Sequence, residues 1–199
     1  MIQNNPEPCE LAEVIYEKPL SGDFQEASFG SDLGNTLWVK FSDKNGIHEW
    51  IGKFADCGRG MRRVIKAVEP DVFFVSAGDF IYLVDATNRK TLNFFYGDQV
   101  NDAIYDPLTK CFIIADCVRL RLVEAGERVW SSKRVALDGI RDLKLKGRVV
   151  SGLALVGFEG KEKSFTFNLD TREVKCEADF SSWDKDFSSW ENKQANLKK

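Results

Sequence analysis

Short apolar runs of strand length, separated by turn-forming residues, follow one another along most of the chain. The run T-L-W-V-K-F (Thr36–Phe41) leads through S-D-K-N-G into I-H-E-W-I-G-K-F (Ile47–Phe54). An Asn-Gly pair between two apolar runs is the strongest short-range signal for a β-hairpin, because both residues tolerate a positive φ. Asn45 and Gly46 therefore predict a hairpin turn.

The same arrangement recurs three more times. The units begin near positions 35, 72, 111 and 149. The period is therefore about 40 residues, the length of a propeller-type repeat. The paired runs of the later units are Asp71–Gly78 with Phe80–Asp85, Lys110–Asp116 with Val118–Val123, and Arg148–Gly157 with Lys163–Asp170.

These repeats predict an all-β fold of about four blade-like antiparallel meanders. A single meander cannot bury both faces, so neighbouring units must stack their sheets. A small or partial β-propeller, closed or as an open half-ring, satisfies this requirement, and so does a β-sandwich. The runs V-F-F-V and C-F-I-I-A are apolar on both faces and predict strands buried between layers. The alternating run V-R-L-R-L-V predicts that Arg119 and Arg121 lie on an exposed face.

The two ends of the chain differ from these repeats. Residues 1–34 are rich in Pro and Gly, and they predict one short strand over Glu10–Glu17. We expect one β-repeat domain over residues 1–177 and an aromatic tail over residues 178–199.

The tail repeats D-F-S-S-W every seven residues. This spacing predicts a short C-terminal helix, with Asp179 as its N-cap and four aromatic side chains along one stripe. Such a helix either packs over its own domain or binds a groove on a protein partner or a second copy. The candidate partner-binding residues are Phe180, Trp183, Phe187 and Trp190.

Composition and charge narrow the class of protein. The formal net charge is -3, so the chain lacks the basic footprint of a nucleic-acid binder. The densest basic cluster, between Arg59 and Lys66, predicts a solvated loop that leads into a strand. We find no secretory leader and no apolar run long enough to span a bilayer, and we therefore expect a cytoplasmic protein without membrane contact.

The cysteines and the single histidine give no cofactor or metal pattern. Five cysteines occur, without a C-x-x-C pair or a zinc-type spacing. This usage is typical of a reducing compartment. His48, the only histidine, directly follows the predicted hairpin turn, where a surface position is expected. We therefore predict no metal and no cofactor.

The last third of the chain resembles a family of bacterial conserved hypothetical proteins that has no assigned activity. The resemblance is carried by W-S-S-K-R-V-A-L-D-G-I (Trp130–Ile140) and F-T-F-N-L-D-T-R-E-V (Phe165–Val174). The family shows a W-x-S…D-G-I segment and then a strand that ends in L-D-x-x-T-G. This chain lacks the glycine of that last turn, because Thr171 is followed by Arg172 and Glu173. The resemblance implies a compact β domain and no particular chemistry.

Candidate chemistry is sparse. Asp85 and Asp170 each end a strand before a Thr-containing turn, and this position predicts a turn-forming role. The acidic residues between positions 98 and 142 could supply a carboxylate pair for glycoside hydrolysis, but no spacing is diagnostic. The candidate ligand-binding residues are Trp130, Asp138, Arg134 and Trp50.

Two functions follow from these observations. The first is a non-enzymatic protein-binding module. Because the chain is acidic, an inhibitory or immunity-type role towards a basic partner is one form of this hypothesis. The second is a protein that binds or hydrolyses a carbohydrate-like ligand, with aromatic faces that stack on the sugar and carboxylates that bond its hydroxyl groups. Because no catalytic motif occurs, the first hypothesis is favoured and an enzyme is the weaker interpretation.

Overall fold

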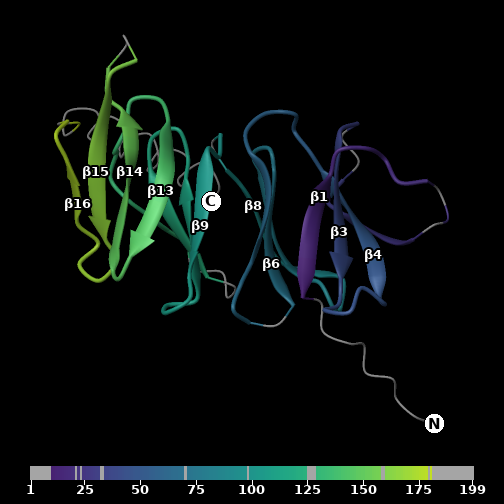
Figure 1. Cartoon of the computed structure of the whole chain (residues 1–199). Coiled ribbons are helices and arrows are strands. Elements are labelled where there is room, and N and C mark those ends of the chain that lie inside the picture. The colour runs from purple at the N-terminus through teal and green to yellow at the C-terminus, as the bar shows by residue number, and fades with distance from the viewer. Residues whose placement is uncertain are drawn as a thin grey trace, which may run out of the picture.

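The computed structural model describes residues 10–20, 22, 24–31, 34–69, 71–97, 99–124, 129–157, 160–178 and 180. Sixteen β-strands in these ranges form four sheets of four strands each (Figure 1). No helix occurs in the described ranges, and the all-β prediction is confirmed. The predicted C-terminal helix lies outside them, apart from Phe180.

Sheets 2, 3 and 4 are antiparallel meanders whose strands pair in chain order. Sheet 2 consists of β5 (Arg62–Lys66), β6 (Val72–Ala77), β7 (Phe80–Asp85) and β8 (Lys90–Tyr96). Sheet 3 consists of β9 (Asp102–Asp106), β10 (Cys111–Ala115), β11 (Leu120–Glu124) and β12 (Val129–Ser131). Sheet 4 consists of β13 (Ile140–Lys146), β14 (Val149–Leu155), β15 (Glu162–Asn168) and β16 (Val174–Cys176). These are the repeats that the sequence period predicts.

Sheet 1 departs from this order. Its strands are arranged β1-β3-β4-β2, and β2 runs parallel to β4. They are β1 (Leu11–Ile15), β2 (Gln25–Phe29), β3 (Thr36–Ser42) and β4 (Glu49–Ala55). The strand predicted before residue 34 corresponds to β1, whereas β2 was not predicted. Its sequence Q-E-A-S-F gives only Ala27 and Phe29 to the core, which is a weak apolar pattern.

The four sheets lie face to face in a row, with sheet 1 and sheet 4 at opposite ends (Figure 1). The first strand of each sheet contacts the first strand of the next, in the order β1, β5, β9 and β13. Asp102 on β9 joins three of these strands. It accepts hydrogen bonds from Nη1 of Arg63 on β5 at 3.0 Å and from the backbone N–H of Leu143 on β13 at 2.8 Å. The N–H of Leu143 is available because β13 has a bulge at this point.

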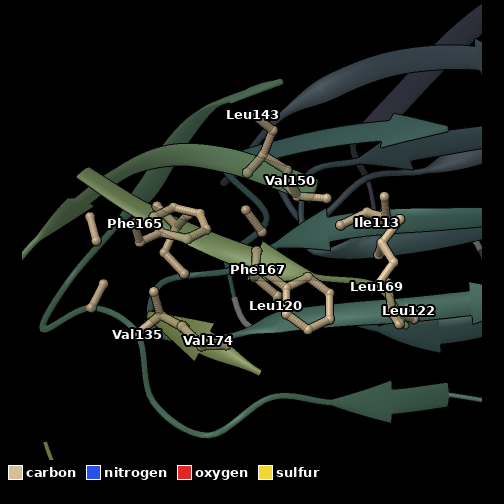
Figure 2. Packing of buried hydrophobic residues seen from close by; sticks show 14 of the residues in the cluster. Ile113, Leu120, Leu122, Val135, Leu143, Val150, Phe165, Phe167, Leu169 and Val174 are labelled. Atoms are coloured by element: carbon tan, nitrogen blue, oxygen red, sulfur yellow. The ribbon is translucent and has the colours of Figure 1, made fainter. Parts of the chain in front are cut away.

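Each pair of neighbouring sheets encloses one hydrophobic layer. Between sheets 3 and 4, Ile113, Leu120 and Leu122 face Phe165 and Phe167 (Figure 2). Strands β6 and β10 are buried on both faces, because each has a neighbouring sheet on either side. This confirms the prediction made from V-F-F-V and C-F-I-I-A.

One of two expectations about charged residues needs correction. Arg119 and Arg121 are half-buried rather than exposed, and Nε of Arg121 donates to Oδ2 of the buried Asp116 at 2.9 Å. The basic cluster that begins at Arg59 is an exposed loop that leads into β5, as predicted. Arg62 belongs to β5 and donates through Nε to Oδ2 of Asp56 at 2.6 Å.

Candidate functional site

Trp50, one of the four predicted ligand-binding residues, is a core residue. It is 4% exposed in the layer between sheets 1 and 2, and it stacks on Phe41 with ring centroids 4.4 Å apart. The guanidinium of Arg89, in the turn between β7 and β8, lies 5.3 Å from the Trp50 ring centroid. A cation above an indole face is a stabilising arrangement, so Trp50 fastens sheet 1 to sheet 2.

Trp130 repeats this arrangement two sheets further along. Its ring stacks on Phe167 of sheet 4 at 5.3 Å, and the guanidinium of Arg172 lies 5.4 Å from the ring centroid. Trp130 packs in the layer between sheets 3 and 4, whereas Trp50 packs in the layer between sheets 1 and 2. The two tryptophans therefore do not line one pocket.

The two polar candidates lie in the connection between β12 and β13. Arg134 donates through Nη1 to the carbonyl oxygens of Ala136 at 3.3 Å and Leu137 at 3.4 Å, so its side chain closes its own loop. Asp138 is exposed in the same connection. The structure thus places Trp50 and Trp130 in separate layers, and it gives Arg134 bonds within its own loop.

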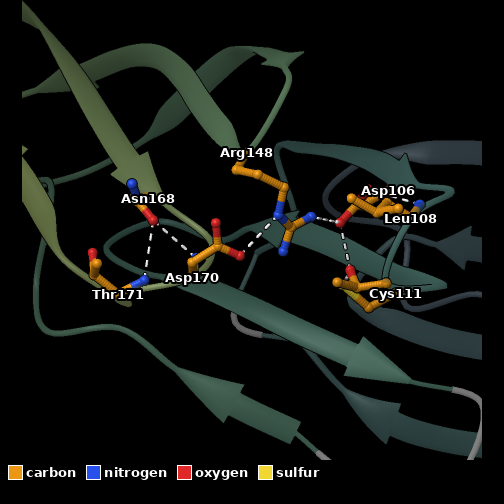
Figure 3. A network of polar contacts seen from close by, with 8 residues as sticks. Asp106, Leu108, Cys111, Arg148, Asn168, Asp170 and Thr171 are labelled. Atoms are coloured by element: carbon orange, nitrogen blue, oxygen red, sulfur yellow. Dashed lines mark hydrogen bonds and ion pairs between the residues drawn. The ribbon is translucent and has the colours of Figure 1, made fainter.

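The buried Asp106 binds its own turn and an arginine from the next sheet. Asp106 accepts hydrogen bonds from the backbone N–H of Leu108 and from the hydroxyl of Thr109, and Nη1 of Arg148 lies 2.6 Å from its Oδ2 (Figure 3). Burial alone would raise the pKa of Asp106, but the bonds from Thr109, Arg148 and Leu108 outweigh it and hold the pKa below its usual value. A general acid needs a raised pKa, so Asp106 does not suit that role.

The predicted turn roles of Asp85 and Asp170 have different outcomes. Asp85 accepts from the backbone N–H of Asn88 at 2.9 Å and fixes the turn after β7, as predicted. In the turn after β15, Oδ1 of Asn168 takes this part by accepting from the N–H groups of Asp170 and Thr171 (Figure 3). The carboxylate of Asp170 instead accepts from Nε of Arg148 at 2.9 Å.

No group of His, Cys, Asp and Glu side chains suited to a metal ion occurs among the described residues. The described part of the chain also has no helix that is long and apolar enough to cross a membrane.

An exposed apolar surface lies on β8, the last strand of sheet 2. We call Phe80, Leu92, Phe94 and Tyr96 the β8 surface. Leu92 is 40% exposed, Phe94 50% and Tyr96 57%, although each side chain is large and apolar. Exposed apolar side chains are common singly, but a contiguous cluster of them marks an interaction site.

Ring contacts link the aromatic members of the β8 surface. The Phe94 ring lies 4.9 Å from the ring of Tyr82 and 5.8 Å from that of Phe80, and Phe80 also meets Tyr96 at 5.8 Å. The Tyr96 hydroxyl donates to Oδ2 of Asp79 at 3.3 Å. The negative charge of Asp79 raises the pKa of Tyr96 above its ordinary value. The three rings of the surface are therefore linked to one another and to the sheet beneath them.

The backbone of β8 is also available. Its only ladder of hydrogen bonds in the described sheets is with β7, so its other edge is unpaired. The pairing is regular from Asn93 to Tyr96 and shifts at Leu92, opposite the Leu83–Val84 step. Basic side chains lie near both ends of the strand, because Lys90 begins it and Arg59 is close enough to Tyr96 to affect the pKa of its hydroxyl.

Sheet 1 has a hollow of about 310 Å³. Trp38 and two lysines, Lys18 and Lys53, line it together with hydroxyl groups from Ser28, Ser31 and Thr36. Nζ of Lys53 lies 5.8 Å from the Trp38 ring centroid and 2.9 Å from Oε2 of Glu26. An aromatic face beside ammonium and hydroxyl groups is suited to a small hydroxylated anion.

Sequence reasoning did not single out the β8 surface or Trp38. Each feature has a local signal, because Leu92, Phe94 and Tyr96 follow one another at every second position and Trp38 alternates with Lys40. The missing information is which face of a strand meets a neighbouring sheet. That depends on how the sheets stack, and a strand pattern does not contain it.

No family model matches this chain, and no curated protein matches its sequence. Among solved structures, hydrazine synthase from Kuenenia stuttgartiensis aligns over 81% of this chain and 52% of its own, with a TM-score of 0.53 and 15% identity. The tricorn protease aligns over 87% of this chain and 18% of its own, with a TM-score of 0.52 and 15% identity. The chain thus spans about half the length of the first protein and under a fifth of the second. At such identity the likeness concerns the fold alone, and the resemblance of the segment after Trp130 to a bacterial family stays a prediction.

Proposed function

We propose that this chain is a non-enzymatic protein-binding module that captures an extended segment of a partner protein on strand β8. The observation that carries the proposal is the β8 surface, where Leu92, Phe94 and Tyr96 expose 40–57% of their area on an unpaired edge strand. Aromatic side chains dominate binding energy at protein interfaces, because they bury a large area at little entropic cost.

The binding mode that fits these groups is addition of a strand. The free edge of β8 offers N–H and C=O groups to an incoming backbone, and the regular stretch Asn93–Tyr96 sets its register. The rings of Phe94 and Tyr96 then contact alternate side chains of the partner. Lys90 and Arg59 favour carboxylates on either side of those apolar positions. The partner segment is therefore extended, apolar at alternate positions and acidic at its flanks.

The scaffold and compartment fit this role. The contacts between the first strands of successive sheets support a partial β-propeller as the scaffold. Three cysteines in the described residues, Cys57, Cys111 and Cys176, are free thiols, which supports a cytoplasmic location.

Peptide selection tests the proposal. A random peptide library is selected on the wild-type protein, and the recovered peptides are titrated against the wild type, Phe94→Ser with Tyr96→Ser, and the control Leu108→Ser. Leu108 is also exposed but lies in the turn between β9 and β10. We expect the selected peptides to be apolar at alternate positions and acidic at their flanks. They should bind the double variant at least tenfold more weakly than the wild type and bind the control as well as the wild type. Peptides that bind all three proteins equally would refute the β8 site.

The hollow in sheet 1 favours a second candidate function, the binding of a small acidic sugar. Trp38 would stack on the sugar ring, and Lys18 and Lys53 would contact its carboxylate. Uronic acids and neutral sugars are titrated one by one into the protein while its tryptophan fluorescence is followed. A saturable response to uronic acids that is lost in Trp38→Ala supports this function. A response that is the same in the wild type and in Trp38→Ala rejects it.

A further inference from the structure

Sheet 4 has one face without a neighbouring sheet. Phe165 and Phe167 of β15 point into the layer shared with sheet 3, so Ser164 and Thr166, which alternate with them, point outward. Strand pairing places Lys144, Ser151, Thr166 and Lys175 in one row across this outward face. The face also bears a hollow of about 340 Å³ that is lined in part by Ser164, Thr166 and Lys175.

The outward face of sheet 4 is less well covered than that of sheet 1. In sheet 1, Ile51 points outward, yet it is 0% exposed. Phe24, from the segment before β2, lies over that face, where its ring centroid is 5.7 Å from Nζ of Lys40. In sheet 4, by contrast, Val149 on the central strand β14 is 38% exposed, and Leu153 on the same face is half-buried. An antiparallel sheet can expose one face to water, but apolar side chains grouped on such a face mark a surface that another segment covers.

The charge of this face is positive. Arg141 is bound to Glu162, with Nη2 of the arginine 2.7 Å from Oε2 of the glutamate. Lys144 and Lys146 form no ion pair with any residue that the structure describes. Two ammonium groups on one exposed sheet face favour an acidic covering segment.

The aromatic repeats of the C-terminal tail have the complementary composition, whereas the three lysines of residues 193–199 lie beyond them. Residues 179–192 contain four carboxylates and one lysine, for a net charge of −3, besides the four aromatic side chains of the D-F-S-S-W repeats. The tail also begins in the right place, because β16 is the edge strand of sheet 4 and ends at Cys176. Phe180, the first aromatic residue of the repeats, is only 9% exposed. The first aromatic side chain of the repeats is therefore already removed from water.

The length of the tail matches the width of the sheet. A helix over residues 180–191 would be about 18 Å long at 1.5 Å per residue. Four strands spaced about 4.8 Å apart span about 15 Å. We propose that residues 179–192 of this chain cover the outward face of sheet 4 as a helix, with the aromatic stripe against Val149 and Leu153 and the carboxylates near Lys144 and Lys146.

Four proteins test this proposal: the full chain and a chain that ends at Phe180, each with and without Lys144→Glu plus Lys146→Glu. We expect removal of the tail to lower the melting temperature by about 5 °C. The two charge reversals lower it in the full chain and leave the shortened chain within about 1 °C of its parent. Reversal of two exposed lysines elsewhere, Lys44→Glu plus Lys66→Glu, is the control and has the same effect in both chains.

Quenching of tryptophan fluorescence by acrylamide gives a second measurement. The signal of the two tail tryptophans is the difference between the full chain and its double variant Trp183→Phe plus Trp190→Phe. We expect the two charge reversals to increase their quenching at least twofold. Equal quenching together with an unchanged melting temperature would overturn the proposal and assign the tail to a partner protein. If the tail tryptophans become better protected from acrylamide as the protein concentration rises, and light scattering shows a dimer, the proposal is overturned. The face would then be covered by the tail of a second copy.

Discussion

Arg148 in the turn between β13 and β14 lies 2.6 Å from the carboxylate of Asp106 in the neighbouring sheet. The same guanidinium bonds Asp170 of its own sheet, so one side chain ties three turns together at one end of sheets 3 and 4 (Figure 3). Asp106 is almost fully buried and Arg148 only partly exposed, so water screens their attraction weakly.

Arg148→Met should destabilise the domain by about 2–3 kcal/mol, because it leaves the buried Asp106 carboxylate without its cation. Urea unfolding of the wild type, Arg148→Met, Asp106→Asn and the double variant measures the coupling between the two residues. We expect the cost of Arg148→Met to fall by at least about 1 kcal/mol in the Asp106→Asn background. Additive costs would show that the pair contributes no coupling energy.

The same pair gives a prediction for acid. The folded-state pKa of Asp106 lies below its value in the unfolded chain, so the carboxylate contributes stability that is fully present above about pH 4 and is lost as the pH falls further. The free energy of unfolding of the wild type should therefore drop more steeply than that of Asp106→Asn below about pH 4. Parallel curves for the two proteins would contradict the lowered pKa.

Gly78, in the turn between β6 and β7, gives a prediction about backbone geometry. It has a φ of +67°, and a Cβ there would lie 2.1 Å from the carbonyl oxygen of Arg59 and 2.7 Å from Sγ of Cys57. Gly46 has nearly the same φ, +68°, but nothing within 4 Å. We expect Gly46→Ala to cost about 1 kcal/mol from the left-handed conformation alone, and Gly78→Ala at least about 3 kcal/mol because the clash is added. Chemical denaturation of both variants measures the difference, and similar costs would mean that the loop at Arg59 moves freely.

The sequence predicted the repeats well, because each strand is specified locally. Gly46 does adopt a positive φ in the turn after β3, and the central strands of sheets 2 and 3 are apolar on both faces. Strand β2 escaped prediction because an edge strand with two core-facing residues has almost no alternating pattern. Its parallel pairing with β4 depends on the path of residues 16–24, which no local pattern encodes.

The candidate site was harder to predict than the fold. Trp50 and Trp130 were chosen as aromatic faces that could stack on a sugar, but each is covered by a ring from its own or the next sheet and by an arginine from a turn of the next sheet. Phe94 has an equally apolar sequence context and is exposed. The difference arises from the stacking of sheets 1 and 2, because sheet 1 covers Tyr82 but leaves the outer part of sheet 2 open.

The exposure of Phe94 predicts a contrast with the core. Phe74 is 0% exposed, and its ring centroid lies 5.2 Å from that of Phe112 across the layer between sheets 2 and 3. We expect Phe74→Ala to cost about 3–5 kcal/mol and Phe94→Ala about 1 kcal/mol, because the Phe94 side chain is only half removed from water. Thermal and urea unfolding compare the two variants. A large loss in Phe94→Ala would mean that the β8 surface is part of the core rather than a binding surface.

Tyr82 and Tyr105 predict how the domain responds to base. Burial raises the pKa of both hydroxyls to about 12. Tyr82 also donates to the carbonyl oxygen of Ala55 at 3.1 Å, and Tyr105 donates to Oε2 of Glu69 at 2.8 Å. In the unfolded chain both hydroxyls titrate near about pH 10. The raised folded-state pKa values therefore contribute stability that is fully present below about pH 10 and is lost as the pH rises towards 12.

For the almost fully buried Tyr82, this loss amounts to about 2–3 kcal/mol. Tyr82→Phe should therefore be less stable than the wild type at neutral pH, because it loses the bond to Ala55, yet its stability should fall less between about pH 10 and 12. Phenolate absorbance followed against pH, together with urea unfolding at each pH, measures both effects. Tyr105→Phe should flatten the same limb of the curve independently, because Tyr105 packs between sheets 2 and 3 whereas Tyr82 packs between sheets 1 and 2. A wild-type curve as flat as that of the two variants would show that both hydroxyls ionise in the folded protein at their ordinary pKa.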